Sequence, residues 1–405
     1  MYETYFEDIK LYTISFVNEF KRREYSEHCG FGIRALKNKK LGFSYCSEKI
    51  EVPDAKKRAE ETSRFSPESN FSFQDKTKKA KLDIFDKKIE NIDITQLKEI
   101  VDQIKDTIKG VDTKRIEISC SNEYVLIEND LGLKTDYSRT SFAAYVEAIK
   151  GNGLGFDLYS SNFLPDKEIS EIGENAANLA KQMEQASKVE TGKYLVVIEQ
   201  ETLANLLEVF LPSFSGEWKR KKISNLYDSY GKKVFDEKLS IYDNPTKTVG
   251  AVPVDDEGTT LRKRGLIEDG IVKDFMYDRE VAALEGVDNE GFCSRSNYSE
   301  PPEISNFAIE IKEGNVRSLD ELGNHICVKS VHGTHTANLT TGDFGVEISA
   351  GFEVKNGEKK PIRGVMMSGN IFDLFRKIEG IEKTRKEFYN LLAPRIAISG
   401  VDIIS

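Results

Sequence analysis

The chain has few of the features that build disulfide frameworks, membrane spans or secretion signals. Its five cysteines are odd in number and include no Cys-x-x-Cys pair, which favours free thiols in a reducing compartment. No apolar run approaches the ~20 residues that cross a bilayer. The acidic start, MYETYFEDIK, lacks the apolar segment of a secretory signal. These absences predict a soluble, cytoplasmic protein. The cysteines are Cys29, Cys46, Cys120, Cys293 and Cys327.

Common catalytic motifs are also missing. None of the four histidines is followed by glutamate, which excludes the zinc-protease helix motifs that begin with His-Glu. There is no Gly-x-Ser-x-Gly, P-loop or Gly-x-Gly-x-x-Gly segment. The carboxylate cluster Asp255-Asp256-Glu257 runs directly into Gly258 and is therefore interpreted as a turn. The residues alone identify no pair with acid and base roles.

The net charge is −10, from 58 basic and 68 acidic residues. Nucleic-acid affinity depends mainly on clustered Lys and Arg, so this balance argues against direct nucleic-acid binding. The densest basic run, residues 219–222, is short and isolated, and we interpret it as a solvated helix edge rather than a binding patch.

What the chain does contain predicts an α+β protein of two domains, residues 1–190 and 191–405, divided at a polar stretch near 187–193. The first is expected to be a sandwich-like domain of hairpin-plus-helix units. Leu41-Gly42-Phe43 and Leu154-Gly155-Phe156 each end a hairpin and are followed by Pro-Asp and a helix. This echo suggests an internal duplication but leaves a chance match open. Expected strands are 12–17, 31–36, 41–46, 116–118, 124–127, 141–149 and 154–159, and expected helices are 54–63, 96–108 and 165–186.

The second half is expected to be strand-rich and mostly antiparallel. Asp269-Gly270 between two apolar pairs is the strongest hairpin signal. A helix is predicted at 202–211 and a final helix at 371–378, with Asn370 as its N-cap. Expected strands are 194–198, 307–311, 325–331, 345–349, 352–355 and 363–367.

The stretch from Val331 to Asn370 holds two histidines in the pattern His-x-x-His. On a helix, His332 and His335 would share one face and could bind a metal. Gly333 and the threonines that follow favour a loop instead, and no second ligand pair accompanies them. We therefore interpret the imidazoles as hydrogen-bonded to loop carbonyl groups, with a metal site as the alternative.

Several segments taken together resemble the TldD/PmbA family, and within it the TldE (PmbA) branch. They are SFSGEWKRKKIS, DSYGKKVFDEKLSIYDNP, VPVDDEGTTLRKRGLIEDGIV, HGTHTANLTTGDFGVEISAGFEVKNGE and MMSGNIFDLF, which cover the second half in order. The resemblance implies a cytoplasmic heterodimer of a TldD-type and a TldE-type chain. That heterodimer would act as a zinc metallopeptidase on unfolded or extended peptides. The family is also described as a modulator of DNA gyrase.

The same resemblance implies where zinc would be held in the TldD branch: by His-Glu-x-x-x-His on a helix and a cysteine near the chain end. The corresponding helix here, Ala204 to Ser213, contains no histidine and no cysteine. The tail from Leu391 to Ser405 also lacks both. We therefore expect no catalytic residue and no metal site in this chain, with zinc in a TldD-type partner. Residues of the polar loop from His332 to Phe344 would face the peptide or partner: His332, Thr334, His335, Thr336, Asn338, Thr341, Asp343 and Phe344.

Two other functions stay open at this point. The chain could be a stand-alone metallopeptidase that uses His332, His335 and a distant carboxylate. It could also be a non-proteolytic regulatory or binding protein of the gyrase-modulator type.

Overall fold

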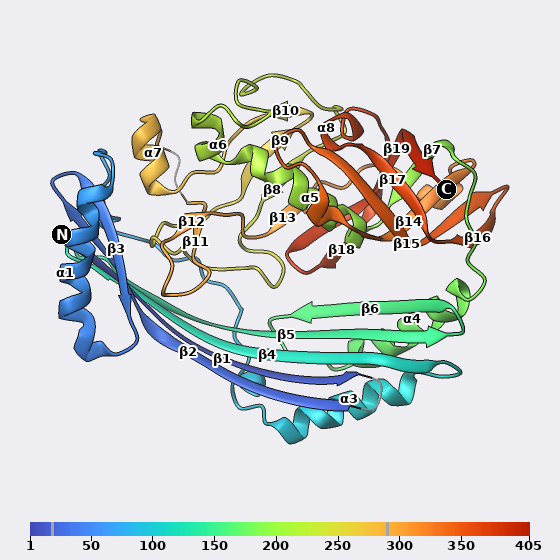
Figure 1. Cartoon of the computed structure of the whole chain (residues 1–405), viewed down its shortest axis with the longest axis horizontal. Coiled ribbons are helices and arrows are strands. Elements are labelled where there is room, and N and C mark those ends of the chain that lie inside the picture. The colour runs from blue at the N-terminus through green and yellow to red at the C-terminus, as the bar shows by residue number, and fades with distance from the viewer. Residues whose placement is uncertain (18–19, 289–290) are drawn as a thin grey trace.

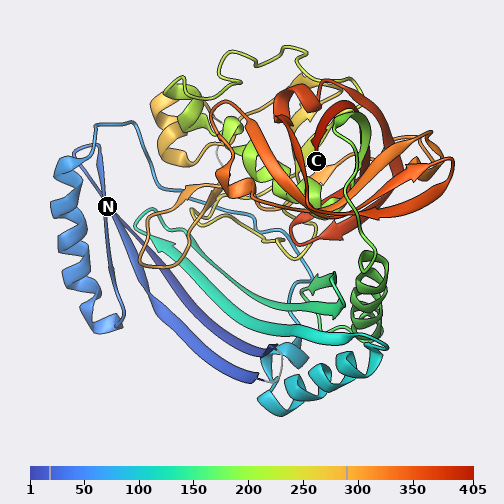
Figure 2. The ribbon, with the colours of Figure 1, turned by 45° about the vertical axis from the view of Figure 1, so that its right-hand side comes forward.

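The computed structural model describes residues 1–17, 20–288 and 291–405, and it has α+β architecture. A six-stranded antiparallel sheet from the first half of the chain lies below the strand-rich second half (Figure 1). Figure 2 shows that the sheet curves around this second half. The first half consists of β1 (Tyr2–Val17), β2 (Phe20–Lys37), β3 (Lys40–Cys46), α1 (Val52–Thr62), α2 (Lys87–Glu90), α3 (Ile94–Thr107), β4 (Asp112–Asn129), β5 (Lys134–Lys150), β6 (Gly153–Ser161) and α4 (Glu168–Met183).

Alternating side chains give the sheet two faces with different partners. Ile116, Ile118 and Cys120 of β4 pack into a core against α3 and α4. A capping box fixes the start of α3, because Asp93 accepts the backbone N–H groups of residues 95 and 96 while Gln96 accepts that of Asp93. The opposite face of the sheet is turned toward the second half of the chain.

The order of the sheet, β3-β2-β1-β4-β5-β6, places two similar units side by side. Each unit is a three-stranded meander followed by a helix, and β1 pairs antiparallel with β4 at the centre. A Cβ on Gly42 would overlap the carbonyl oxygen of Ala59 in α1, and one on Gly155 would overlap that of Ala176 in α4. Both Leu-Gly-Phe segments thus form an edge strand on which the following helix packs closely.

The second half is built on a closed ring of five strands, in the order β7-β14-β15-β17-β19 and back to β7. Its interior and flanks hold the large apolar core of this half. The described elements are β7 (Gly192–Ile198), α5 (Gln200–Phe210), α6 (Gly216–Arg220), β8 (Ile241–Asp243), β9 (Arg264–Glu268), β10 (Ile271–Val272), α7 (Arg279–Glu285), β11 (Cys293–Ser294), β12 (Glu303–Ile304), β13 (Ile309–Ile311), β14 (His325–His332), β15 (Asp343–Lys355), β16 (Glu358–Ile362), β17 (Val365–Asn370), α8 (Ile371–Leu374), β18 (Ile378–Phe388) and β19 (Leu391–Ile404).

The Asp269-Gly270 hairpin is confirmed, and both residues adopt positive φ, 48° and 77°. The predicted N-cap is confirmed as well, since Asn370 accepts the N–H of Phe372 at 3.1 Å. The predicted final helix at 371–378 is wrong in length. It ends after one turn at Leu374, and Ile378 begins β18, where pairing with β19 outweighs the helical pattern. Several predicted strands are parts of longer ones, as β4 and β15 show.

Two kinds of contact join the halves. Tyr5, Val125 and Tyr137 of the sheet share an apolar cluster with Val254 and Phe307 of the second half. An extended segment, residues 66–86, also touches both halves; for example, its Ala80 N–H donates to Pro253 O at 3.2 Å. Among the described helices, none is long and apolar enough to cross a membrane.

Candidate functional site

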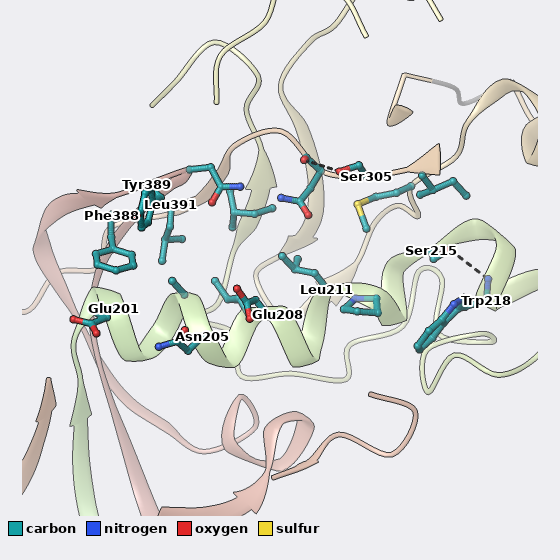
Figure 3. Close-up of a pocket in the computed structure, with 18 residues that line it drawn as sticks. Glu201, Asn205, Glu208, Leu211, Ser215, Trp218, Ser305, Phe388, Tyr389 and Leu391 are labelled. Atoms are coloured by element: carbon teal, nitrogen blue, oxygen red, sulfur yellow. Dashed lines mark hydrogen bonds between the residues drawn. The ribbon is translucent and has the colours of Figure 1, made fainter. Parts of the chain in front are cut away.

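A cavity of about 590 Å³ lies along α5, at the side of the second half that faces the sheet (Figure 3). The floor is the polar face of α5. One wall is formed by the β18–β19 turn with Phe388, Tyr389 and Leu391, and another by the segment around Ser305. Trp218 of α6 closes the far end.

The amphipathic pattern of α5 explains why polar groups reach the cavity. Leu203, Leu206 and Phe210 are fully buried in the core of the second half. On the opposite face, Glu201 and Glu208 line the cavity, seven residues apart. Two helical turns separate them, which corresponds to about 10 Å along the axis.

Glu201 is the more enclosed of the two carboxylates. Its Oε1 accepts a hydrogen bond from Ser330 Oγ at 2.7 Å. Burial raises the pKa of Glu201 to about 7, and the Ser330 hydrogen bond and Lys329 offset this only in part. The carboxyl group can therefore hold or release a proton near neutral pH.

This pKa predicts how Glu201→Gln changes stability with pH. The folded-state pKa lies above the ordinary value of 4.5, so the folded protein binds more protons between about pH 4.5 and 7 and loses stability as pH rises through that window. Glutamine has no proton to lose. We expect the variant to match the wild type near pH 4.5 and to exceed its free energy of unfolding by about 1 kcal/mol at pH 8, allowing for partial exposure.

Urea denaturation at several pH values measures this difference. Glu379→Gln, at an exposed position of β18, is the matched control for loss of one carboxylate. A stability difference between Glu201→Gln and the wild type that stays constant from pH 4.5 to 8 contradicts the prediction.

The remaining cavity residues are aromatic, aliphatic, amide or hydroxyl-bearing, with one methionine. Trp218, the only tryptophan of the chain, lies at one end, and Phe388 and Tyr389 lie at the other. Tyr389 has φ 49°, a left-handed conformation uncommon for a bulky residue. No local pattern in the sequence marks these residues as a site. The polar face of α5 has the same pattern as a solvated helix face, and residues so distant in sequence converge only in the fold.

The loop predicted to face a peptide or partner lies elsewhere. None of its eight residues lines the α5 cavity, although the short turn Thr334–Thr336 packs against α5. Seven of the eight are exposed or half-buried, whereas Phe344 is 5% exposed and lies in the core. Its side chain is thus directed inward. The seven are His332, Thr334, His335, Thr336, Asn338, Thr341 and Asp343.

Hydrogen bonds within this loop hold its shape. Asn338 Oδ1 accepts the backbone N–H groups of residues 340 and 341, and Asp343 accepts from Thr341 Oγ1 at 2.7 Å and from Asn370 Nδ2 at 2.8 Å. These two residues therefore have structural tasks. The interpretation of the histidines as bonded to loop carbonyls is wrong. Within the described part of the chain, neither His332 nor His335 makes such a bond, since both side chains point to solvent.

The acidic triplet forms the expected turn, with Gly258 N–H donating to Asp255 O at 2.9 Å, but it is buried rather than exposed. Glu257 accepts from Arg34 Nη1 at 2.5 Å, and Arg34 Nε donates to Glu3 at 2.8 Å. Asp256 Oδ2 accepts the backbone N–H of Arg295 at 2.6 Å. This charge network connects the sheet with the second half and lies apart from the α5 cavity.

The basic run at 219–222 is the solvated helix edge that was predicted. Arg220 and Lys221 pair with Glu217, and Lys219 pairs with Glu285. All five cysteines are free thiols.

Comparison with known proteins gives a consistent result over the whole chain. The models of the PmbA/TldA metallopeptidase domain 1, central domain and C-terminal domain match residues 2–63, 87–184 and 191–405. An uncharacterized protein of Methanocaldococcus jannaschii is 30% identical over 383 residues, which span 92% of this chain and 88% of the relative. A zinc metalloprotease TldD homolog of Saccharolobus solfataricus is 28% identical over 385 residues, 89% of this chain and 84% of its own.

Solved structures share the fold. TldE from Thermococcus kodakarensis superposes with a TM-score of 0.89 at 21% identity, covering 100% of this chain and 96% of that one. A suggested modulator of a DNA gyrase from Thermotoga maritima gives a TM-score of 0.90 at 22% identity, covering 99% and 95%.

Proposed function

Because the chain belongs to the PmbA/TldD metallopeptidase family, we propose that it is a TldE-like subunit of a two-chain zinc peptidase. In this proposal the TldD-type partner holds the zinc, and the α5 cavity of this chain forms part of the groove for an extended peptide. The observation that carries the proposal is that α5 lines the cavity but does not present the ligands that a catalytic zinc requires.

A catalytic zinc needs about three protein ligands and an open position for water. The cavity offers two carboxylates, Glu201 and Glu208, and no histidine or cysteine. Even together they would supply only two of the three ligands, and about 10 Å of helix axis separates them. In residues 1–17, 20–288 and 291–405, no three His, Cys, Asp or Glu side chains cluster in a way that could hold a metal. The residues of this chain therefore do not fit a zinc ion, and we derive no step through one.

The cavity does suit the main chain of a peptide. The side-chain amides of Asn205, Asn306 and Asn390 line it, and no described residue hydrogen-bonds to them. An amide donates and accepts at once, so it can pair with any peptide bond whatever the sequence.

The exposed loop at 332–343 is proposed to contact the partner chain. Asn338 and Asp343 organise the loop internally, so their loss would disturb its shape. His335 is exposed and makes no such contact among the described residues, which makes it the cleaner probe of an interface.

Reconstitution with a TldD-type chain that carries His-Glu-x-x-x-His tests the proposal. We expect sub-stoichiometric zinc in the isolated chain, and at least a ten-fold rise in cleavage of an unfolded peptide when this chain joins the partner, compared with either chain alone. Elemental analysis and a fluorogenic peptide assay measure both quantities. His335→Ala is expected to weaken assembly in analytical ultracentrifugation, with Glu379→Gln as the surface control.

Stoichiometric zinc in the isolated chain, together with cleavage in the absence of a partner, would contradict the proposal. That result would instead support a stand-alone metallopeptidase.

A further inference from the structure

The charged side chains that line the α5 cavity are all acidic. Among its 18 lining residues, Glu201 and Glu208 carry carboxylates, and there is no lysine, arginine or histidine. Both carboxylates belong to α5, the floor of the cavity, with Glu201 in its first turn and Glu208 in its last (Figure 3). A ligand in this cavity therefore meets negative charge without a protein cation to offset it inside the lining.

Neither carboxylate is neutralised by an ion pair with a described residue. Glu208 is exposed and has no hydrogen-bond or ion-pair partner in the described part of the chain. Glu201 has only the Ser330 hydroxyl as a direct partner, at 2.7 Å. Lys329, the cation that lowers the pKa of Glu201, is itself paired with Glu199 at 3.6 Å.

The environment of Glu201 adds further negative charge. Burial has the largest effect and raises the pKa of Glu201; the Ser330 hydrogen bond and Lys329 lower the pKa by less, and Asp157 of β6 and Glu199 raise it by smaller amounts still. A buried carboxylate of this kind gains stability when a ligand brings a positive charge next to it.

The other walls fit the apolar stem of a cationic side chain. Leu211, Pro212 and Met276 provide aliphatic contacts, and Trp218 and Tyr389 present aromatic rings. Lys and Arg side chains bury their methylene stems against such surfaces and bring their charged heads to carboxylates or aromatic faces.

We propose that the α5 cavity selects extended peptides that carry a cationic group, with Glu208 and Glu201 as the specificity-determining residues. The shared chemistry is an ammonium or guanidinium group, from a lysine or arginine side chain or from the peptide's amino terminus. This inference rests on the proposed function, because it assigns a preference to the same peptide groove.

Trp218 provides a built-in probe, because the only tryptophan of the chain lies in the cavity. The full-length chain is titrated with an acetylated, amidated octapeptide containing one central lysine, and binding is followed by tryptophan fluorescence. The reference peptide has glutamine in place of lysine. A third peptide has glutamine and a free amino terminus. We expect the lysine peptide, the free-terminus peptide or both to bind at least five-fold more tightly than the reference. The peptide that binds more tightly identifies whether the cation comes from a side chain or from the amino terminus.

Variants locate the effect. Glu208→Gln is expected to weaken binding of the preferred cationic peptide about five-fold and to leave the reference peptide unchanged, with the preference shrinking at high salt. Glu201→Gln is expected to act in the same direction. Glu379→Gln is the matched control, since it removes an exposed carboxylate at the far end of β18 from the Phe388–Leu391 turn.

The two possible failures are distinguishable. Equal binding of all three peptides, unaffected by Glu208→Gln, would overturn the cationic preference and leave the peptide groove standing. If no peptide alters Trp218 fluorescence or competes with another for the chain, both the preference and the groove are overturned.

Discussion

Replacing Arg34 with methionine is expected to lower the free energy of unfolding by about 3–5 kcal/mol. The Arg34 side chain is 2% exposed and forms ion pairs with Glu3 and Glu257, whose side chains are fully buried. Burial opposes the charge of Arg34, but the attraction of Glu3 and Glu257 is larger, so the pKa of the guanidinium is raised. Removal of the cation leaves two buried carboxylates without their main partner, which costs far more than the lost contact alone.

The position of Arg34 adds to this effect. It lies on β2, its partner Glu257 belongs to the second half, and its guanidinium stands 5.3 Å from the ring centre of Phe71 in the segment that crosses between the halves. One side chain thus connects three parts of the molecule. Arg295 approaches the same Glu3 at 3.5 Å but keeps its own contacts with the Tyr5 ring and Glu300, so it does not replace Arg34.

Urea denaturation followed by circular dichroism measures the loss. Arg22→Met is the control, because Arg22 and Glu24 form an ion pair with side chains 73% and 52% exposed, and such pairs contribute about 0–1 kcal/mol. The triple variant Arg34→Met, Glu3→Gln, Glu257→Gln is expected to recover part of the stability, since it removes the unpaired charges as well. A loss below about 1 kcal/mol for Arg34→Met would contradict the assigned role.

The network also shows what the sequence could and could not predict. The turn at Asp255–Gly258 follows from local residue preferences, and it forms. The burial of Glu257 depends on Arg34, more than two hundred residues away, and no local pattern indicates such a pairing. A run of three acidic residues is normally solvated, so the run carries no local signal of a buried partner.

Elements that depend on local residue preferences, like the turn at Asp255–Gly258, were predictable from the sequence. The helix α3 and the Asp-Gly hairpin depend on residues close in sequence, and both form near their predicted positions. The predicted helix at 371–378 was too long, because α8 ends at Leu374 and the chain pairs with β19 as strand β18 from Ile378 onward. The α5 cavity could not be predicted, because its walls come from four separate segments that meet only in the fold.

The second large effect on stability is expected from replacing Gly155 or Gly42 with valine. We expect Gly155→Val to lower the free energy of unfolding by about 3 kcal/mol, at the upper end of the usual overpacking cost. Its φ is not in the left-handed region, so backbone strain is not the cause. A Cβ at this position would overlap the carbonyl oxygen of Ala176 and the backbone nitrogen of Ala180, and backbone atoms of a packed helix cannot move aside as a flexible side chain can.

The equivalent position in the other unit makes the prediction sharper. A Cβ on Gly42 would overlap the carbonyl oxygen of Ala59 in α1, so Gly42→Val is expected to be destabilising for the same reason. Gly323→Val is the matched control, because its φ is not positive and no atom lies within 4 Å of the added Cβ; its effect is expected within about 0.5 kcal/mol. Thermal unfolding measures all three. If Gly155→Val is as stable as Gly323→Val, α4 can move away from the edge strand without cost. The glycine of the repeated Leu-Gly-Phe segment would then not be required for close packing of each helix on its edge strand, and the repeat would have no structural explanation.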